Sequence, residues 1–166
     1  MKILALDSSG LVASVAVVEN DTLLAEYTVN YKKTHSQTLL PMLDEISNMT
    51  ELDLSTIDAI AVAGGPGSFT GLRIGSATAK GLGLALEKPL ISIPTTAAIA
   101  YNIWDTDKFV CPIMDARRNQ VYTGVYCYTD HRLDTVWEQD TMSIEALAEG
   151  LNCLDHEVIF LGDGVA

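Results

Sequence analysis

The feature that most limits how this chain can fold is a repeated order of predicted strands and helices. Short apolar runs predict strands, and leucines at three- and four-residue spacing predict helices. The first copy has three strands, a helix, a strand, a helix, a strand and a helix, at residues 2–7, 12–18, 22–29, 36–49, 57–63, 71–86, 90–93 and 95–104. From residue 109 the same order restarts and reaches a fourth strand, at residues 109–115, 120–128, 133–138, 143–150 and 158–161. This order predicts an α/β protein with a first unit at 1–104 and a partial second unit at 105–166.

Two turns of the first unit follow strands and have residues suited to binding an anion. One is Asp7-Ser8-Ser9, and the other is Gly64-Gly65-Pro66-Gly67-Ser68, which leads into the helix at 71–86. Exposed N–H groups at the start of a helix attract phosphate groups. The glycine-rich turn, however, lacks the Gly-Lys-Ser/Thr ending of a P-loop, and its glycines miss the GxGxxG spacing. A phosphate site and a tight turn that packs the helix on the sheet both remain open.

The helix after this turn carries small residues at regular spacing. One row repeats every four residues and a second row lies beside it, made up of Gly71, Gly75, Ala79 and Gly83, and of Ala77, Gly81 and Ala85. A glycine inside a helix costs about 1 kcal/mol relative to alanine, so these glycines need a compensating contact. Small rows let another backbone approach closely. The contact is either a tight fit within the chain or association with a second helix.

The charge balance restricts the partners that the chain can bind by itself. The sequence has 22 acidic and 10 basic residues, a formal net charge of −12. Residues 130–166 hold nine acidic residues and one basic residue. Binding to a phosphate backbone or to an anionic membrane requires clustered Lys and Arg. The composition therefore argues against binding of either one by this chain alone. The acidic last quarter is either a solvated face or a docking surface for a basic partner.

Sequence motifs for a catalytic centre or a metal site are missing. The three histidines lie in no nucleophile or metal motif, and the three cysteines form no CxxC pair. The first apolar run, residues 3–6, is too short for a signal peptide. We therefore expect reduced thiols, a cytoplasmic location, no catalytic residue and no metal held by this chain.

Several segments of the chain carry specific motifs: Asp7-Ser8-Ser9, His35-Ser36-x-x-Leu39-Leu40-Pro41, the run from Gly65 to Gly75, Ala79-Lys80-Gly81-Leu82 and Asp115-Ala116-Arg117-Arg118. Together these segments resemble the TsaB (YeaZ) family, whose members are partners in bacterial synthesis of the tRNA modification N6-threonylcarbamoyladenosine. The resemblance implies an actin-like, ASKHA (ribonuclease H-like) fold of two lobes, with the second lobe incomplete in this chain. Family members normally continue through the rest of that lobe.

The resemblance also implies a non-catalytic subunit. The catalytic relative TsaD places two metal-binding histidines after the strand that corresponds to residues 90–93, and the aligned positions here are near Thr95 and Ile99. Thr95 and Ile99 are not a pair of side chains that can hold a catalytic metal. ATP, ADP and metal are therefore expected on partner subunits and not on this chain alone. The alternative is an enzyme of the same fold, either an ATP-binding phosphotransferase or a metallopeptidase-like protein.

The family further implies partners and contact residues. TsaD is expected to pair with the two long helices of the first unit, through Ser36, Leu39, Leu40, Leu43, Gly71, Leu72, Gly75, Ala79 and Gly83. The ATPase TsaE is a second partner, tRNA is reached only through the complex, and a homodimer is an option for the isolated chain. Basic residues are scarce, so those in the matching segments are further candidates for partner contacts: Arg73, Lys80, Arg117 and Arg118.

Overall fold

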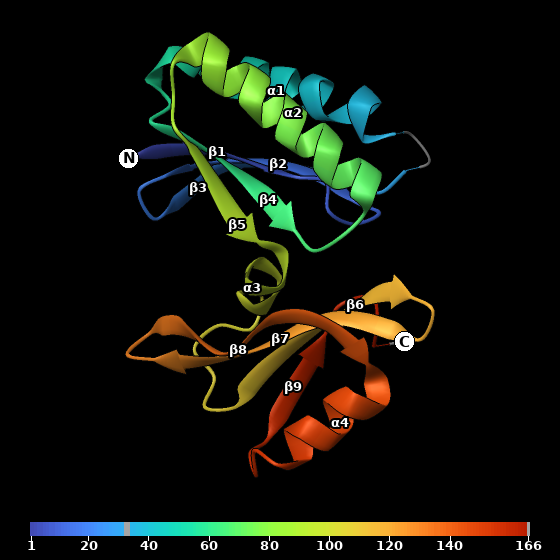
Figure 1. Ribbon diagram of the computed structural model, residues 1–166. Coiled ribbons are helices and arrows are strands. Elements are labelled where there is room, and N and C mark those ends of the chain that lie inside the picture. Colours follow the sequence, from blue (N-terminus) through green and yellow to red (C-terminus); the bar gives the residue numbers. More distant parts are fainter. Residues whose placement is uncertain (32–33, 166) are drawn as a thin grey trace. The chain divides into compact units, whose positions relative to one another are not determined.

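The computed structural model describes residues 1–31 and 34–165, and it divides into two compact units, the first at Met1–Ile93 and the second from Pro94 onward (Figure 1). The first unit contains β1 (Lys2–Asp7), β2 (Ala13–Glu19), β3 (Thr22–Val29), α1 (His35–Thr50), a 3-10 turn η1 (Leu54–Thr56), β4 (Ala59–Gly65), α2 (Phe69–Leu86) and β5 (Leu90–Pro94). The second contains α3 (Thr95–Ala100), β6 (Phe109–Arg117), β7 (Gln120–Thr129), β8 (Arg132–Ser143), α4 (Ile144–Asn152) and β9 (Val158–Leu161). The predicted order of strands and helices is confirmed.

The first unit is a five-stranded sheet with two helices on one face. Its strand order is β3-β2-β1-β4-β5, with β1 antiparallel to β2 and parallel to β4. Alternate residues of β1, Leu4 and Leu6, point into the core, as the period of two in a strand requires. Figure 1 shows α1 and α2 side by side over the same face of the sheet. The apolar side of α1, which includes Met42 and Ile46, packs on this face and completes the core.

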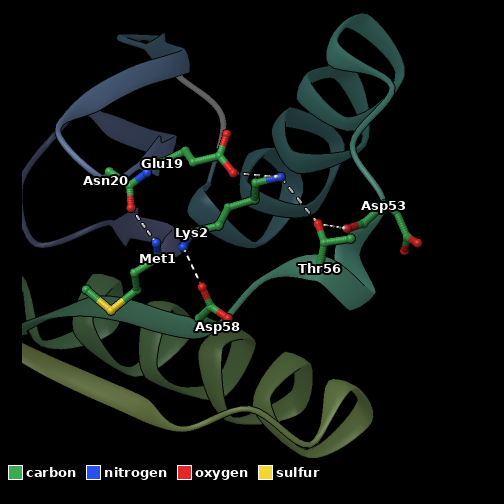
Figure 2. A network of polar contacts seen from close by, with 7 residues as sticks. All are labelled: Met1, Lys2, Glu19, Asn20, Asp53, Thr56 and Asp58. Atoms are coloured by element: carbon green, nitrogen blue, oxygen red, sulfur yellow. Dashed lines mark hydrogen bonds and ion pairs between the residues drawn. The ribbon is translucent and has the colours of Figure 1, made fainter.

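Polar contacts anchor the start of β1 to both of its neighbours (Figure 2). The contacts join Met1, Lys2, Glu19, Asn20, Asp53, Thr56 and Asp58. The backbone N–H of Lys2 donates to Asp58 Oδ2 at 2.7 Å, and its Nζ lies 3.6 Å from Glu19 Oε1. Lys2 Nζ also donates to Thr56 Oγ1 at 3.4 Å. These contacts help to set the register of β1 between β2 and β4, on which the position of the following turn depends.

Asp53 in this network gives a pH-dependent contribution to stability. The N–H of Ser55 donates to Asp53 Oδ1 at 2.9 Å, which lowers the pKa of the Asp53 carboxyl below its usual value of 3.8. Because the pKa is lower in the folded state, the charged carboxylate stabilises the fold at pH values above the unfolded-state pKa. This stabilisation is lost as the pH falls through the folded-state pKa. Asp53→Ala is therefore expected to lower the urea midpoint at pH 7, and the difference from the parent should shrink below pH 4. Asp134→Ala, at an exposed residue of β8, is the control. A difference that persists at pH 2 would contradict this account.

The second unit has a four-stranded sheet in the order β8-β7-β6-β9, with β6 antiparallel to β7 and parallel to β9. Its main core packs Leu147 and Leu151 of α4 against Val121 and Val125 of β7 and against Cys111. The three cysteines are free thiols in the structure, with Cys111 buried, Cys127 half-buried and Cys153 exposed. No helix in the described residues combines the length and the apolar character that crossing a membrane requires.

The division between the units differs from the predicted boundary after residue 104. It falls after Ile93, and α3 lies with the second unit. The physical reason is the contacts of α3: Thr96 Oγ1 lies 2.7 Å from the hydroxyl of Tyr126, and Ala100 packs on Val110 and Tyr126. The predicted helix at 95–104 is also shorter, because α3 ends at Ala100.

Candidate functional site

The two candidate anion-binding turns lie against each other at the carboxyl ends of β1 and β4. The backbone N–H of Ser68 donates to the carbonyl of Ser9 at 2.7 Å, and the hydroxyl of Ser8 donates to the carbonyl of Gly71 at 2.9 Å. Asp7 Oδ1 accepts the N–H of Ser9 at 2.7 Å. The two turns that the sequence analysis singled out therefore lie at one place in the fold. Several polar groups of the turns make hydrogen bonds within the protein, and these bonds hold the turns together. This arrangement fits the tight-turn alternative.

The glycines of this region permit close backbone approach. A Cβ at Gly67, where φ is +154°, would overlap the carbonyl oxygen of Ser9. A Cβ at Gly64 would overlap the hydroxyl of Ser92 on β5, and Gly65 with Pro66 forms the bend between them. Phosphate binding by these residues remains a prediction, since both roles use the same glycines.

The first row of small residues on α2 faces the chain's own sheet. Gly71, Gly75, Ala79 and Gly83 are all buried. A Cβ at Gly71 would overlap the Ser8 carbonyl oxygen, a Cβ at Gly75 would overlap the Ser8 hydroxyl, and one at Gly83 would lie 2.8 Å from Leu90 Cδ2. The assignment of this row to a partner interface is wrong, because the turn after β1 and the strand β5 already occupy the space beside it.

Two of the α1 residues predicted at the interface are also in the core. Leu39 and Leu43 are buried against the sheet with the rest of the apolar side of α1. Ser36 and Leu40 lie on the other side of the helix and are exposed, Leu40 at 53%. Consecutive helix residues point 100° apart, and Leu40 falls just outside the buried stripe that contains Leu39 and Leu43. Of the four predicted α1 contacts, only Ser36 and Leu40 are accessible.

The outward face of α2 is small and apolar, with two basic residues. Its exposed residues are Phe69, Thr70, Arg73, Ala77, Lys80, Gly81, Leu84 and Ala85, and we call them the outer α2 face. Leu84 is 84% exposed and Phe69 is 72% exposed, with the guanidinium of Arg73 4.6 Å from the Phe69 ring centre. Leu72 is half-buried beside it. The second small row, Ala77, Gly81 and Ala85, thus points away from the sheet, although the sequence analysis had assigned the first row to the partner interface. Phe69 and Leu84 were missed, although their spacing with Arg73, Ala77 and Lys80 places them on one helix face.

The other two basic candidates lie at the tip of a hairpin in the second unit. Arg117 ends β6 and Arg118 follows in the turn to β7, and both are exposed. Their backbone φ angles are +64° and +56°. The two arginines are therefore held in a conformation that non-glycine residues rarely adopt.

The positions aligned with the histidines of TsaD lie on α3. Thr95 is 1% exposed and its hydroxyl has no hydrogen-bond partner among the described residues, while Ile99 is half-buried. Among residues 1–31 and 34–165, no group of three His, Cys, Asp or Glu side chains is placed to hold a metal ion. His35, the first residue of α1, donates from Nε2 to the carbonyl of Gly10 at 3.0 Å. This contact links α1 to the turn after β1.

Comparison with known proteins identifies relatives along nearly the whole chain. The family model described as "TsaD: tRNA N6-adenosine threonylcarbamoyltransferase" matches residues 22–165. The tRNA threonylcarbamoyladenosine biosynthesis protein TsaB of Bacillus subtilis is 37% identical over 98% of this chain and 71% of the relative. The TsaB protein of Escherichia coli is 32% identical over 99% of this chain and 72% of the relative.

Solved structures agree with these sequence relatives. The structure of YeaZ from Pseudomonas aeruginosa matches with a TM-score of 0.77 and 31% identity, over 87% of this chain and 68% of that one. An activator of 2-hydroxyisocaproyl-CoA dehydratase from Clostridium difficile, at 14% identity and a TM-score of 0.50, shares the fold alone. The fold is the actin-like, ASKHA type that the sequence resemblance implied. With relatives this similar over two thirds of their length or more, the chain belongs to the TsaB (YeaZ) family.

Proposed function

We propose that this chain is a non-catalytic partner subunit that binds and activates TsaD in the synthesis of N6-threonylcarbamoyladenosine on tRNA. The names of its relatives support the pathway, since they are tRNA threonylcarbamoyladenosine biosynthesis proteins. The observation that carries the docking part of the proposal is the outer α2 face. It is a helix surface of small and apolar side chains left uncovered by the chain's own sheet.

The chemistry of this face suits a helical partner. Ala77 and Gly81 are exposed, and a Cβ built on Gly81 meets no atom within 4 Å. A second helix can approach such a row closely and pack its ridges into the groove. Leu84 and Leu40 supply apolar area at 84% and 53% exposure, which is the kind of side chain that the centre of a protein interface buries. The proposed partner surface is thus the outer α2 face together with Ser36 and Leu40.

The side chains of Thr95 and Ile99 on α3 favour a non-catalytic role for this chain. Ile99 has a hydrocarbon side chain, and the Thr95 hydroxyl is buried at 1% exposure. Divalent metals in catalytic sites need imidazole, carboxylate or thiolate ligands, and these two side chains supply none. In the proposal the reacting groups therefore belong to TsaD, and this chain stabilises the form of TsaD that uses them.

A reconstitution assay tests the proposal. Modification of an in vitro transcribed tRNA is measured with TsaC, TsaD, TsaE and ATP, with and without this chain. We expect modified adenosine to accumulate only when the chain is present, and this chain alone to give none. Equal modification without the chain would overturn the proposal. Release of phosphate from ATP by the purified chain alone would instead favour the phosphotransferase alternative, for which Asp7 and the turn at Gly64–Ser68 are the candidate site.

A further inference from the structure

The tip of the β6–β7 hairpin has an unusual backbone. Arg117, Arg118 and Asn119 have φ angles of +64°, +56° and +59°, in the left-handed region that glycine adopts more easily than other residues. The pairing of β6 with β7 also shifts register here, since Asp115 pairs with Val121 but Arg117 pairs with Gln120. Glycine is the usual left-handed residue at such a bulge. Arginine at these positions costs conformational free energy, and a compensating role for the side chains is expected.

The tip is held in a defined position. Asp115 Oδ1 accepts the N–H of Arg117 at 2.7 Å, and this hydrogen bond fixes the end of β6 where the turn begins. The N–H of Asp115 in turn donates to Asp163 Oδ1 at 3.2 Å, from the loop that follows β9. The carboxylates of Asp115 and Asp163 thus each accept a backbone N–H group. The arginine side chains are therefore presented from a preformed turn.

The side chains of the tip are exposed and have no ionic partner. Arg117, Arg118, Asn119 and Gln120 are all exposed. Within the part of the chain that the structure describes, neither guanidinium lies within ion-pair distance of a carboxylate. From residue 94 to the end the sequence has twelve acidic residues and four basic residues, so carboxylates are plentiful in this unit. Two guanidinium groups left unpaired in an acidic unit are available to an anion from outside.

We propose that this tip, residues 117–120, contacts the phosphate backbone of tRNA when the complex with TsaD holds the tRNA. The inference rests on the proposed function and extends it to a specific contact. A guanidinium matches a phosphate with two parallel N–H donors, and Asn and Gln side chains also donate to phosphate and sugar oxygens. The tip has no apolar side chain, whereas a protein interface usually centres on apolar and aromatic anchors. A polyanion therefore fits the tip better than an acidic protein segment.

The net charge of −12 explains why this contact needs the complex. Most of the chain repels a polyanion, so the tip alone is too small to hold tRNA at physiological salt. In the complex TsaD holds the tRNA, and the tip adds local contacts to a ligand that is already positioned. The isolated chain is accordingly expected not to bind tRNA.

The test compares an Arg117→Gly/Arg118→Gly double variant with the parent chain, each in complex with TsaD. Each complex is titrated with an in vitro transcribed tRNA over a range of salt concentrations. We expect tRNA affinity to fall about tenfold, and the slope of log K against log salt to fall by about one for each lost phosphate contact. The thermal midpoint of the free chain should rise, because glycine relieves the left-handed backbone. Loss of affinity together with gain of stability is a combination that a purely structural role cannot produce. Arg132→Gly, at another exposed arginine of the same unit, is the matched control and should leave tRNA affinity unchanged.

The outcomes separate this inference from the proposed function. If the parent chain binds TsaD and supports modification, but the double variant keeps the parent's tRNA affinity and salt slope, the phosphate contact is overturned and the proposed function stands. Weaker binding of TsaD itself by the double variant would make the tip a protein contact and also overturn the inference. Failure of the parent chain to bind TsaD would overturn the proposed function on which the inference rests.

Discussion

Gly71→Ala is expected to lower the free energy of unfolding of the first unit by about 3 kcal/mol, the upper part of the range for overpacking a core. The new Cβ would overlap the carbonyl oxygen of Ser8 and lie 3.2 Å from Cδ2 of His35. The Ser8 carbonyl is a backbone atom of the turn after β1, so it cannot move aside as a flexible side chain does. The α2 helix must instead lift from the sheet, which opens the core. Urea unfolding followed by circular dichroism measures the change.

Gly81→Ala is the matched control on the same helix. Gly81 is exposed, and no atom lies within 4 Å of a Cβ built there. Alanine at an exposed position inside a helix restricts the unfolded chain, so stability should rise by about 0.5–1 kcal/mol. The two substitutions add the same methyl group but act in opposite directions. Equal effects of the two would show that Gly71 is not pressed against the turn after β1.

Ala77→Arg is expected to weaken binding of TsaD at least 100-fold, a loss of about 2.7 kcal/mol. Ala77 lies in the outward small row, where a partner helix is proposed to approach the α2 backbone. A long charged side chain holds such a helix away and must lose its hydration in the interface. Isothermal titration and co-elution in gel filtration measure the loss. The fold should be unaffected, because the side chain at position 77 points away from the sheet.

Ala148→Arg provides the matched control for this variant. Ala148 is an exposed alanine on α4 of the second unit, and the same charge is added there. Its affinity for TsaD should equal that of the parent. Parent-like binding by Ala77→Arg would remove the outer α2 face from the proposed interface. Gly75→Leu is not a suitable variant for this purpose, because position 75 is buried and the change would disrupt the core before it tested any partner.

Local patterns were sufficient to predict the elements, and the resemblance of several motifs to a known family predicted the family. Alternating apolar residues in β1 and leucine spacing in α1 reflect periods of two and 3.6, which operate within a few residues of chain. The same reasoning identified both small rows of α2. It was insufficient to say which row faces inward, because both consist of alanine and glycine at four-residue spacing.

Other errors have the same origin. Leu39 and Leu40 are equally apolar in sequence, yet only Leu39 is buried. The helix α3 follows β5 directly but packs with β6 and β7, through residues such as Tyr126 that lie 30 positions away. The left-handed backbone at Arg117 and Arg118 also has no sequence signal, since the usual signal for that conformation is glycine.

The order of strands and helices, the family and the positions of turns and close approaches could all be read from the amino-acid sequence. Which side of each helix packs in the core and which side stays exposed became clear only from the fold. The physical reason is that this choice depends on contacts between distant segments, such as the hydrogen bond from the Ser8 hydroxyl to the Gly71 carbonyl, 63 residues apart. That contact brings the turn after β1 against one row of α2 and thereby leaves the other row exposed.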